Sequence, residues 1–240
     1  MEAEERLIFA LDVTDFDKAV SLLDKLEKTI KWVKVNSLAA AFPEIIEEIK
    51  QRKMKVWRDW KHHDIPGTVK NFIIADILRD IDMTTVHILG GKKMLEYAVE
   101  TKKEFNSNIK ILGITILTSH DQKSFNEELG FPGVIEVKVY QLARLASEVG
   151  IDGVVCSAKE LSYLRDFPNL IKVTPGIKPL WAQGRKDQKR VTTPSEAILK
   201  GADYIVVGSA IHKSPNPKEA AEKIVAEIES ALEVKEWVWE

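Results

Sequence analysis

The chain has 240 residues, of which 45% are hydrophobic and 30% are charged, and its formal net charge is −2. This length allows one large domain with a substantial core, including α/β barrels of this size. The near-neutral charge argues against a general nucleic-acid or acidic-membrane surface, and no apolar run approaches the length of a membrane span.

The first residues and the cysteine usage indicate a soluble cytoplasmic protein. The start, Met1-Glu2-Ala3-Glu4-Glu5, is acidic, which is the opposite of the basic end of a signal peptide. Cys156 is the only cysteine and lies in an apolar run, so we expect a buried, inert thiol in a reducing compartment.

Short apolar runs alternate with amphipathic stretches along the first half of the chain. Helical spacing of apolar residues, proline at a first helical turn and β-branched runs distinguish the elements. The predicted strands are Leu7–Asp12, Trp32–Val35, Lys55–Lys61, Asp82–His87 and Ile109–Leu117, and the predicted helices are Phe16–Lys28, Pro43–Lys53, Pro66–Arg79 and a segment from Gly90-Gly91 to Phe105.

The second half continues the same alternation after a polar, less regular segment from Ser119 to Phe131. The predicted strands are Gly153–Cys156, Leu170–Thr174 and Tyr204–Val207, and the predicted helices are Val134–Val149, Ala158–Arg165, a segment capped by Thr193-Pro194-Ser195-Glu196, and Pro217–Leu232. The stretch Pro175–Arg190 is long for a connection, which suggests a functional loop.

Eight strand-plus-helix units predict a single-domain (β/α)8 TIM barrel over residues 1–240, with 233–240 as a C-terminal tail. A doubly wound open sheet is the alternative, but no glycine-rich dinucleotide turn follows the first strand. No composition shift marks a second domain.

A cluster of charges lies at the end of the third predicted strand. The strand period of two places Asp59 and Lys61 on one face, and Asp64 follows in the turn before the next helix. Because unpaired charges are costly in an interior, such a cluster is either mutually neutralised or used in chemistry.

Other polar residues follow the remaining strands. Asp12, Lys34, His87, Thr118 and Ser209 each lie at or near a strand's carboxyl end, which is where barrel active sites are found. A structural ion pair explains any one of them, but the convergence of the group favours a functional site.

These residues are similar to a known family. The pattern Asp59-x-Lys61-x-x-Asp64-Ile65-Pro66-x-Thr68 resembles the signature of orotidine 5'-phosphate decarboxylases. The similarity extends over nearly the whole chain, through Phe9–Val13, Trp32–Val35, Thr85–His87, Leu117–Ser119, Asp152–Ser157, Val173–Ile177, Asp187–Val191 and Val206–Gly208.

The resemblance implies removal of CO2 from orotidine 5'-phosphate to give UMP in pyrimidine synthesis, without metal or cofactor. Lys61 would donate the proton to C6 of the pyrimidine, and Asp59 would lie against the departing carboxylate. Lys34 and Asp64 would complete an alternating charge chain, and flanking carboxylates would favour the charged form of Lys61.

The remaining site residues are also implied by the resemblance. Asp12 would hold the ribose, Thr118 would lie near the base, and Asp64 and Thr68 would reach into the neighbouring subunit of a homodimer. The full expected substrate-binding set is Asp12, Ile65, Thr68, Thr118, Pro175, Lys178, Gln188, Gly208 and Ser209.

Some positions depart from the family pattern. Ser209 and Lys178 stand where the family has arginine, and a guanidinium fork matches a phosphate better than a hydroxyl does. We therefore expect a weaker phosphate grip, by roughly 1.5–3 kcal/mol for each charged hydrogen bond lost. Arg185 or Lys186 could supply a replacement cation.

Two alternatives to an active decarboxylase remain. The chain is a remodelled or engineered decarboxylase scaffold with weakened or lost catalysis and an altered assembly interface, or a relative that acts on a sugar phosphate with a divalent metal. A metal site at His62-His63 is disfavoured, because adjacent strand residues point to opposite faces and no third ligand is suitably spaced.

Overall fold

The computed structural model describes residues 1–182 and 192–239, and within them eight strands follow one another in chain order around a closed parallel barrel. The strands are β1 (Leu7–Ala10), β2 (Trp32–Val35), β3 (Lys55–His62), β4 (Met83–His87), β5 (Lys110–Ile114), β6 (Gly153–Val155), β7 (Ile171–Thr174) and β8 (Tyr204–Val207). The expected (β/α)8 barrel is confirmed.

Helices separate the strands along the chain. The α-helices are α1 (Ala3–Arg6), α2 (Phe16–Leu26), α3 (Ser37–Ala41), α4 (Ile45–Gln51), α5 (Pro66–Leu78), α6 (Lys92–Glu104), α7 (Gln122–Glu127), α8 (Ile135–Val149), α9 (Pro194–Lys200), α10 (Ser209–His212) and α11 (Pro217–Trp239), and the 3-10 turns are η1 (Ile88–Gly90), η2 (Leu161–Leu164) and η3 (Leu180–Ala182). None of the described helices is long and apolar enough to cross a membrane.

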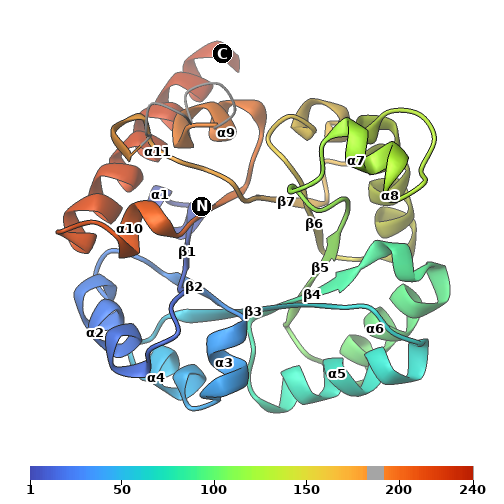
Figure 1. Cartoon of the computed structure of the whole chain (residues 1–240), viewed down its shortest axis with the longest axis horizontal. Coiled ribbons are helices and arrows are strands. Elements are labelled where there is room, and N and C mark those ends of the chain that lie inside the picture. The colour runs from blue at the N-terminus through green and yellow to red at the C-terminus, as the bar shows by residue number, and fades with distance from the viewer. Residues whose placement is uncertain (183–191, 240) are drawn as a thin grey trace. The chain divides into compact units, whose positions relative to one another are not determined.

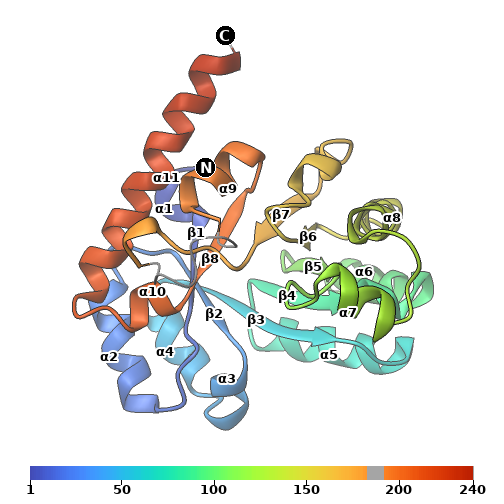
Figure 2. The same ribbon diagram turned by 45° about the horizontal axis from the view of Figure 1, so that its top comes forward.

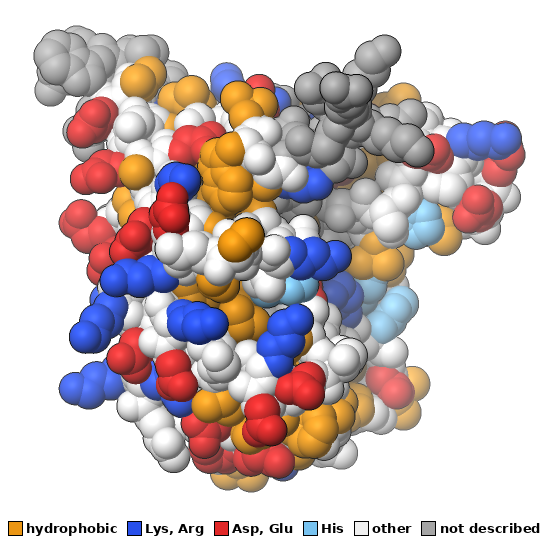
Figure 3. All heavy atoms as spheres, turned by 60° about the vertical axis from the view of Figure 1, so that its left-hand side comes forward, with side chains coloured by type: hydrophobic (Ala, Val, Ile, Leu, Met, Phe, Trp, Pro, Cys, Tyr) orange, Lys and Arg blue, Asp and Glu red, His pale blue; other side chains and the backbone are white. Residues whose placement is uncertain are grey.

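The chain forms two compact units, and the first comprises Met1–Asp59 and Gly176–Glu240. In this unit β1 pairs with β2 on one side and with β8 on the other. Helices α2, α4, α10 and α11 lie outside these strands (Figure 1). Figure 3 shows Lys and Arg side chains interspersed with Asp and Glu over this outer face, and i,i+4 ion pairs on α11 such as Lys223–Glu219 balance opposite charges.

The second unit is Trp60–Pro175, in which β4, β5, β6 and β7 pair in succession. Helix α5 packs on α6, and α6 packs on α8, along the outer side of these strands (Figure 2). A parallel sheet in such a fold is covered on both faces, so its strands are nearly continuous apolar runs. Strand β1 of the first unit is an example, because all four of its residues are buried.

The predicted strands are all present, but several element boundaries were wrong. The strand predicted over Ile109–Leu117 ends at Ile114, and the segment predicted as the helix Ala158–Arg165 is only the 3-10 turn η2. A helical turn, α7, begins in the segment predicted to be irregular, because the Asp121 side chain caps the Ser124 amide. Helices α1, α3 and α10 were not predicted.

The largest boundary error concerns the C-terminus. Helix α11 was expected to end at Leu232 but continues to Trp239, so most of the predicted tail is helical. The sequence after Leu232 contains neither glycine nor proline to end the helix, and Glu233 and Lys235 are good helix formers. The expectation of a single domain stays a prediction.

Candidate active site

A buried lysine lies between two carboxylates in the first unit. Lys34, on β2, donates from Nζ to Asp12 Oδ1 at 3.2 Å, and the same Nζ lies 3.8 Å from Oδ2 of Asp59 on β3. The side chains of Lys34 and Asp59 are only 9% and 8% exposed, whereas that of Asp12 is 47% exposed. The ammonium is therefore held in the interior by its two anionic neighbours, and Asp12 opens toward solvent.

Strand pairing explains how this Asp12–Lys34–Asp59 array forms. Ala10 is the partner of Lys34 in the β1–β2 ladder, and the amide of Leu11 donates to the Lys34 carbonyl oxygen at 3.0 Å beyond the strand. This hydrogen bond extends the pairing of the two segments by one residue beyond β1. Asp12, the next residue, can therefore reach the Lys34 side chain. An isolated buried ammonium would be costly, and the array offsets that cost by pairing and hydrogen bonding.

Gly208, directly after β8, lies close to the end of β1 and to Asp12. A Cβ on Gly208 would lie 3.3 Å from the Ala10 Cβ and 3.7 Å from Asp12 Oδ2. The backbone after β8 thus passes directly over the ends of β1 and the Asp12 carboxylate. A side chain at position 208 would press on both, so this close approach favours glycine.

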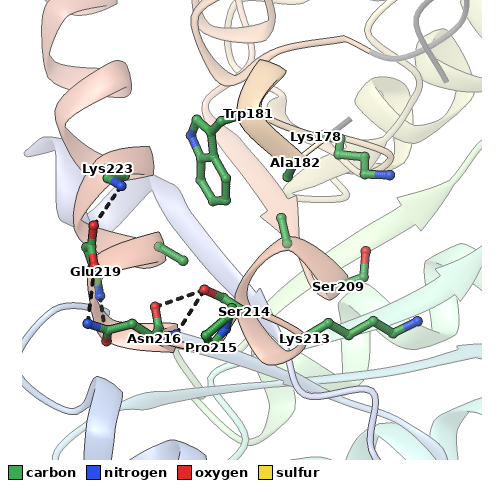
Figure 4. Close-up of a pocket in the computed structure, with 12 residues that line it drawn as sticks. Lys178, Trp181, Ala182, Ser209, Lys213, Ser214, Pro215, Asn216, Glu219 and Lys223 are labelled. Carbon is green, nitrogen blue, oxygen red and sulfur yellow. Dashed lines mark hydrogen bonds and ion pairs between the residues drawn. The ribbon is translucent and has the colours of Figure 1, made fainter. Parts of the chain in front are cut away.

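A pocket of about 560 Å³ lies beside Gly208, within the first unit. Lys178, Ser209 and Lys213 lie along one part of its wall, as Figure 4 shows. The Trp181 indole projects between these residues and the opposite wall, where Lys223 and Glu219 form an ion pair of 2.7 Å. The pocket therefore has one wall with a neutralised lysine and another with two further lysines.

Lys61 lies in the second unit, near the end of β3. Its φ of +51° is in the left-handed region, which a lysine seldom adopts. Its amide donates to the Thr85 hydroxyl on β4 at 2.8 Å. Asp59 and Lys61 are separated by one residue on β3, so covalent geometry alone keeps their Cα atoms within about 7 Å of each other.

Residues 63–65 form an exposed turn into α5. The Asp64 carboxylate accepts from the Ile65 amide at 2.7 Å, and Pro66 begins the helix. Ile65 is 70% exposed, and Thr68 lies in the first turn of α5, with its amide donating to the Ile65 carbonyl oxygen. Asp64 and Thr68 thus lie on the accessible side of this turn.

The other predicted residues divide between the two units. Thr118 lies in an exposed turn after β5, and Pro175 follows β7, both in the second unit, whereas Lys178 and Ser209 share the pocket of the first. Gln188, Arg185 and Lys186 lie outside the described residues.

His87, at the end of β4, is kept neutral by its surroundings. Burial first, and then charge repulsion from the nearby His63 and Lys61, together lower its pKa to about 4. The His63 and His87 rings stack with centroids 5.0 Å apart. Because His87 is uncharged, the Lys61 ammonium has no positive imidazolium at this position to repel it.

A polar network beside Lys61 was missed from the sequence. His62 Nε2 lies 3.2 Å from Oδ2 of Asp76 on α5, and the Thr84 hydroxyl donates to the same oxygen at 2.7 Å. Asp76 interrupts an apolar run of α5, which was the available signal. No group of three or more His, Cys, Asp or Glu side chains that could hold a metal ion occurs within residues 1–182 and 192–239.

The barrel, the Asp12–Lys34–Asp59 array and the lysine-bearing pocket define the class of protein, a (β/α)8-barrel protein with a charged site at the carboxyl ends of its strands. The model of the orotidine 5'-phosphate decarboxylase / HUMPS family matches residues 5–224. The chain belongs to this family.

Individual relatives agree with the family match. The orotidine 5'-phosphate decarboxylases of Gloeothece citriformis and Heliobacterium modesticaldum are 38% and 39% identical to it, over 93% and 97% of this chain and 97% and 99% of their own. The crystal structure of orotidine 5'-phosphate decarboxylase from Lactobacillus acidophilus superposes with a TM-score of 0.80 at 31% identity, covering 93% of this chain and 99% of that one.

The lowered pKa of His87 predicts a loss of stability in acid. Between pH 6.5 and about 4, His87 is protonated in the unfolded chain but remains neutral in the folded protein. The contribution of His87 to the free energy of unfolding should therefore fall as the pH falls through this window. After allowance for solvent screening, His87→Gln should remove about 1–2 kcal/mol of this loss by pH 4.5, as measured by urea unfolding at several pH values.

Glu160→Gln is the control of opposite sign. Burial raises the pKa of Glu160 to about 7, so this residue costs stability as the pH rises from 4.5 toward 7. Its replacement should therefore remove a loss of stability that grows across pH 4.5–7, which is opposite in sign to the effect of His87. Equal pH slopes for His87→Gln and wild type between pH 6.5 and 4 would contradict the assignment.

Proposed function

We propose that the chain decarboxylates orotidine 5'-phosphate to UMP, with Lys61 as the proton donor. The observation that carries the proposal is the Asp12–Lys34–Asp59 array, which holds a buried ammonium at the strand ends of a chain of this family. Relatives that share 38–39% of its sequence over nearly their full length carry the name of this decarboxylase.

The proposed chemistry needs only groups of this chain. The bond between C6 and the carboxylate breaks, CO2 leaves, and the electron pair stays on C6. The Lys61 ammonium stabilises this developing negative charge and then gives C6 a proton. Asp59 would lie against the departing carboxylate, and Lys34 and Asp64 would extend the alternation of charges.

The pocket beside Gly208 is the proposed phosphate end of the site. Asp12 would accept hydrogen bonds from the ribose hydroxyls, and the phosphate would lie against Lys178, Ser209 and Lys213. Lys213 has no ion-pair partner within the part of the chain that the structure describes, whereas Lys223 is neutralised by Glu219. A phosphate would thus meet cations despite the serine at position 209. Ile65, Thr68, Thr118, Pro175 and Gln188 remain proposed substrate contacts.

We also propose that the enzyme is a homodimer that works in the cytoplasm. Ile65, directly before α5, and Leu78, its last residue, are large apolar side chains that are 70% and 75% exposed, which a contact with a second copy would explain. A second copy covering α5 would bury them and receive Asp64 and Thr68. The buried thiol of Cys156 fits a reducing compartment.

Lys61→Ala should abolish turnover. Losing a positioned general acid costs about a thousandfold in kcat, and the fall in absorbance of orotidine 5'-phosphate measures it. Lys31→Ala is the matched control, because Lys31 is a surface lysine paired with Glu4 at 3.2 Å away from α5, and its loss should leave kcat unchanged. Equal turnover in Lys61→Ala and wild type would contradict the assignment, and no turnover in wild type would favour the scaffold alternative.

Lys213→Gln should weaken UMP binding about tenfold while uridine binding stays the same, because only UMP carries the phosphate. Calorimetry at fixed ionic strength measures both affinities. The double variant Lys223→Gln/Glu219→Gln removes the whole ion pair from the same pocket and leaves the local charge unchanged, so UMP affinity should not change. An equal loss in the two variants would reduce the role of Lys213 to a general contribution to the electrostatic potential.

Leu78→Glu should shift the dimer toward monomer in sedimentation equilibrium, because it places a charge in the proposed contact of α5. Val137→Glu is the control, since Val137 is also an exposed apolar residue, at 52%, but lies on α8. A wild-type monomer at every concentration, or equal behaviour of the two variants, would contradict the proposed interface.

A further inference from the structure

Lys61 is held in its uncommon backbone conformation from both sides. The amide of Lys61 itself donates to the Thr85 hydroxyl at 2.8 Å. On the next residue, His62 pairs with Asp76, which also accepts from Thr84. His62 is 5% exposed, and Asp76, Thr84 and Thr85 are completely buried. A left-handed lysine persists only where its surroundings over-determine it, and these contacts are of that kind.

Thr84 and Thr85 are neighbours on β4, so their side chains point to opposite faces of the strand. Thr84 faces α5 and holds Asp76, which holds His62. Thr85 faces the other way and holds the Lys61 amide. One strand therefore anchors both residue 61 and residue 62, and neither threonine can shift without moving the other's contact.

Packing reinforces the α5 side of this network. The His62 ring stacks on Phe72 of α5, with centroids 4.6 Å apart and planes 9° apart. The imidazole is thus fixed in orientation by a ring one helical turn before Asp76. A buried carboxylate that lost its histidine or threonine contact would be strongly destabilised, which makes this arrangement all-or-none rather than gradually adjustable.

We propose that Asp76, His62 and the two threonines are positioning residues for the reaction, and that they aim the Lys61 ammonium by fixing the backbone on both sides of it. This inference rests on the proposed role of Lys61 as proton donor. Misplacement of a reacting group by about 1 Å can cost about a hundredfold in rate, so the effect should fall on kcat and not on substrate binding.

The test uses two variants that act from opposite faces of β4. Thr85→Val removes the hydroxyl that holds the Lys61 amide, and Asp76→Asn weakens the grip on His62 from the α5 side, where no contact with substrate can account for a loss. Both should lower kcat about ten- to a hundredfold with KM and UMP affinity within about twofold of wild type. Thr85→Ser keeps the hydroxyl and should restore kcat.

Thr101→Val is the matched control. Thr101 is also completely buried, and its hydroxyl donates to the Tyr97 carbonyl oxygen at 2.6 Å within α6, away from Lys61. It should lower the melting temperature as the test variants do, but leave kcat unchanged. If Thr85→Val and Asp76→Asn lower kcat no more than Thr101→Val does, the network is merely structural and the inference is overturned.

Amide hydrogen exchange at Lys61 gives a readout that does not need turnover. The amide should exchange slowly in wild type and Thr101→Val, and at least tenfold faster in Thr85→Val. If wild type fails to decarboxylate orotidine 5'-phosphate, the proposed function fails, but faster exchange in Thr85→Val still supports the hold on Lys61. Unchanged exchange in that variant overturns it.

Discussion

Lys34 carries a positive charge into the end of β2, and the rest of the candidate site depends on how that charge is balanced. Asp12 and Asp59 approach it from β1 and β3, and the ladder bond from Leu11 to the Lys34 carbonyl sets the first of these approaches. Because pairing two carboxylates with one ammonium leaves the group with an excess of negative charge, the array is suited to attract a further cation. Lys61 follows Asp59 by two residues on β3.

A hydrogen bond holds the backbone of Lys61, and a nearby histidine is kept neutral. The lowered pKa of His87 removes a competing cation, and the Thr85 hydroxyl satisfies an amide in a conformation that few lysines adopt. The same five-residue strand, β4, supplies Thr84, Thr85 and His87. These three residues hold Asp76, hold the Lys61 amide and provide the neutral imidazole near Lys61, respectively. A rigid strand is a better support for such a site than a loop, because its side-chain directions are fixed by the ladder.

The sequence predicted the barrel because parallel strands covered on both faces must be apolar throughout, and the strands Trp32–Val35 and Tyr204–Val207 were predicted to the residue. Helix ends were less predictable. Helix α11 contains no stop signal after Leu232, and α7 depends on a cap by Asp121 that looked like loop polarity. The charged residues at the strand ends were predictable because charge is unusual there. The network of His62, Asp76 and Thr84 was not predictable. It depends on contacts between strands and a helix, and the spacing of residues along one element does not reveal such contacts.

The surroundings of Ser209 include a lysine that the sequence alone does not place beside it. From the sequence, the loss of a guanidinium at this position predicted a weaker hold on phosphate. In the fold, the amide of Lys213 donates to the Ser209 carbonyl oxygen at 3.1 Å, one helical turn away, and both residues line the same pocket. A cation four residues later on a helix covers the same side of it. An ammonium on a flexible stem provides the charge without the bidentate geometry, so the substitution should change the geometry of anion recognition more than its electrostatic sign.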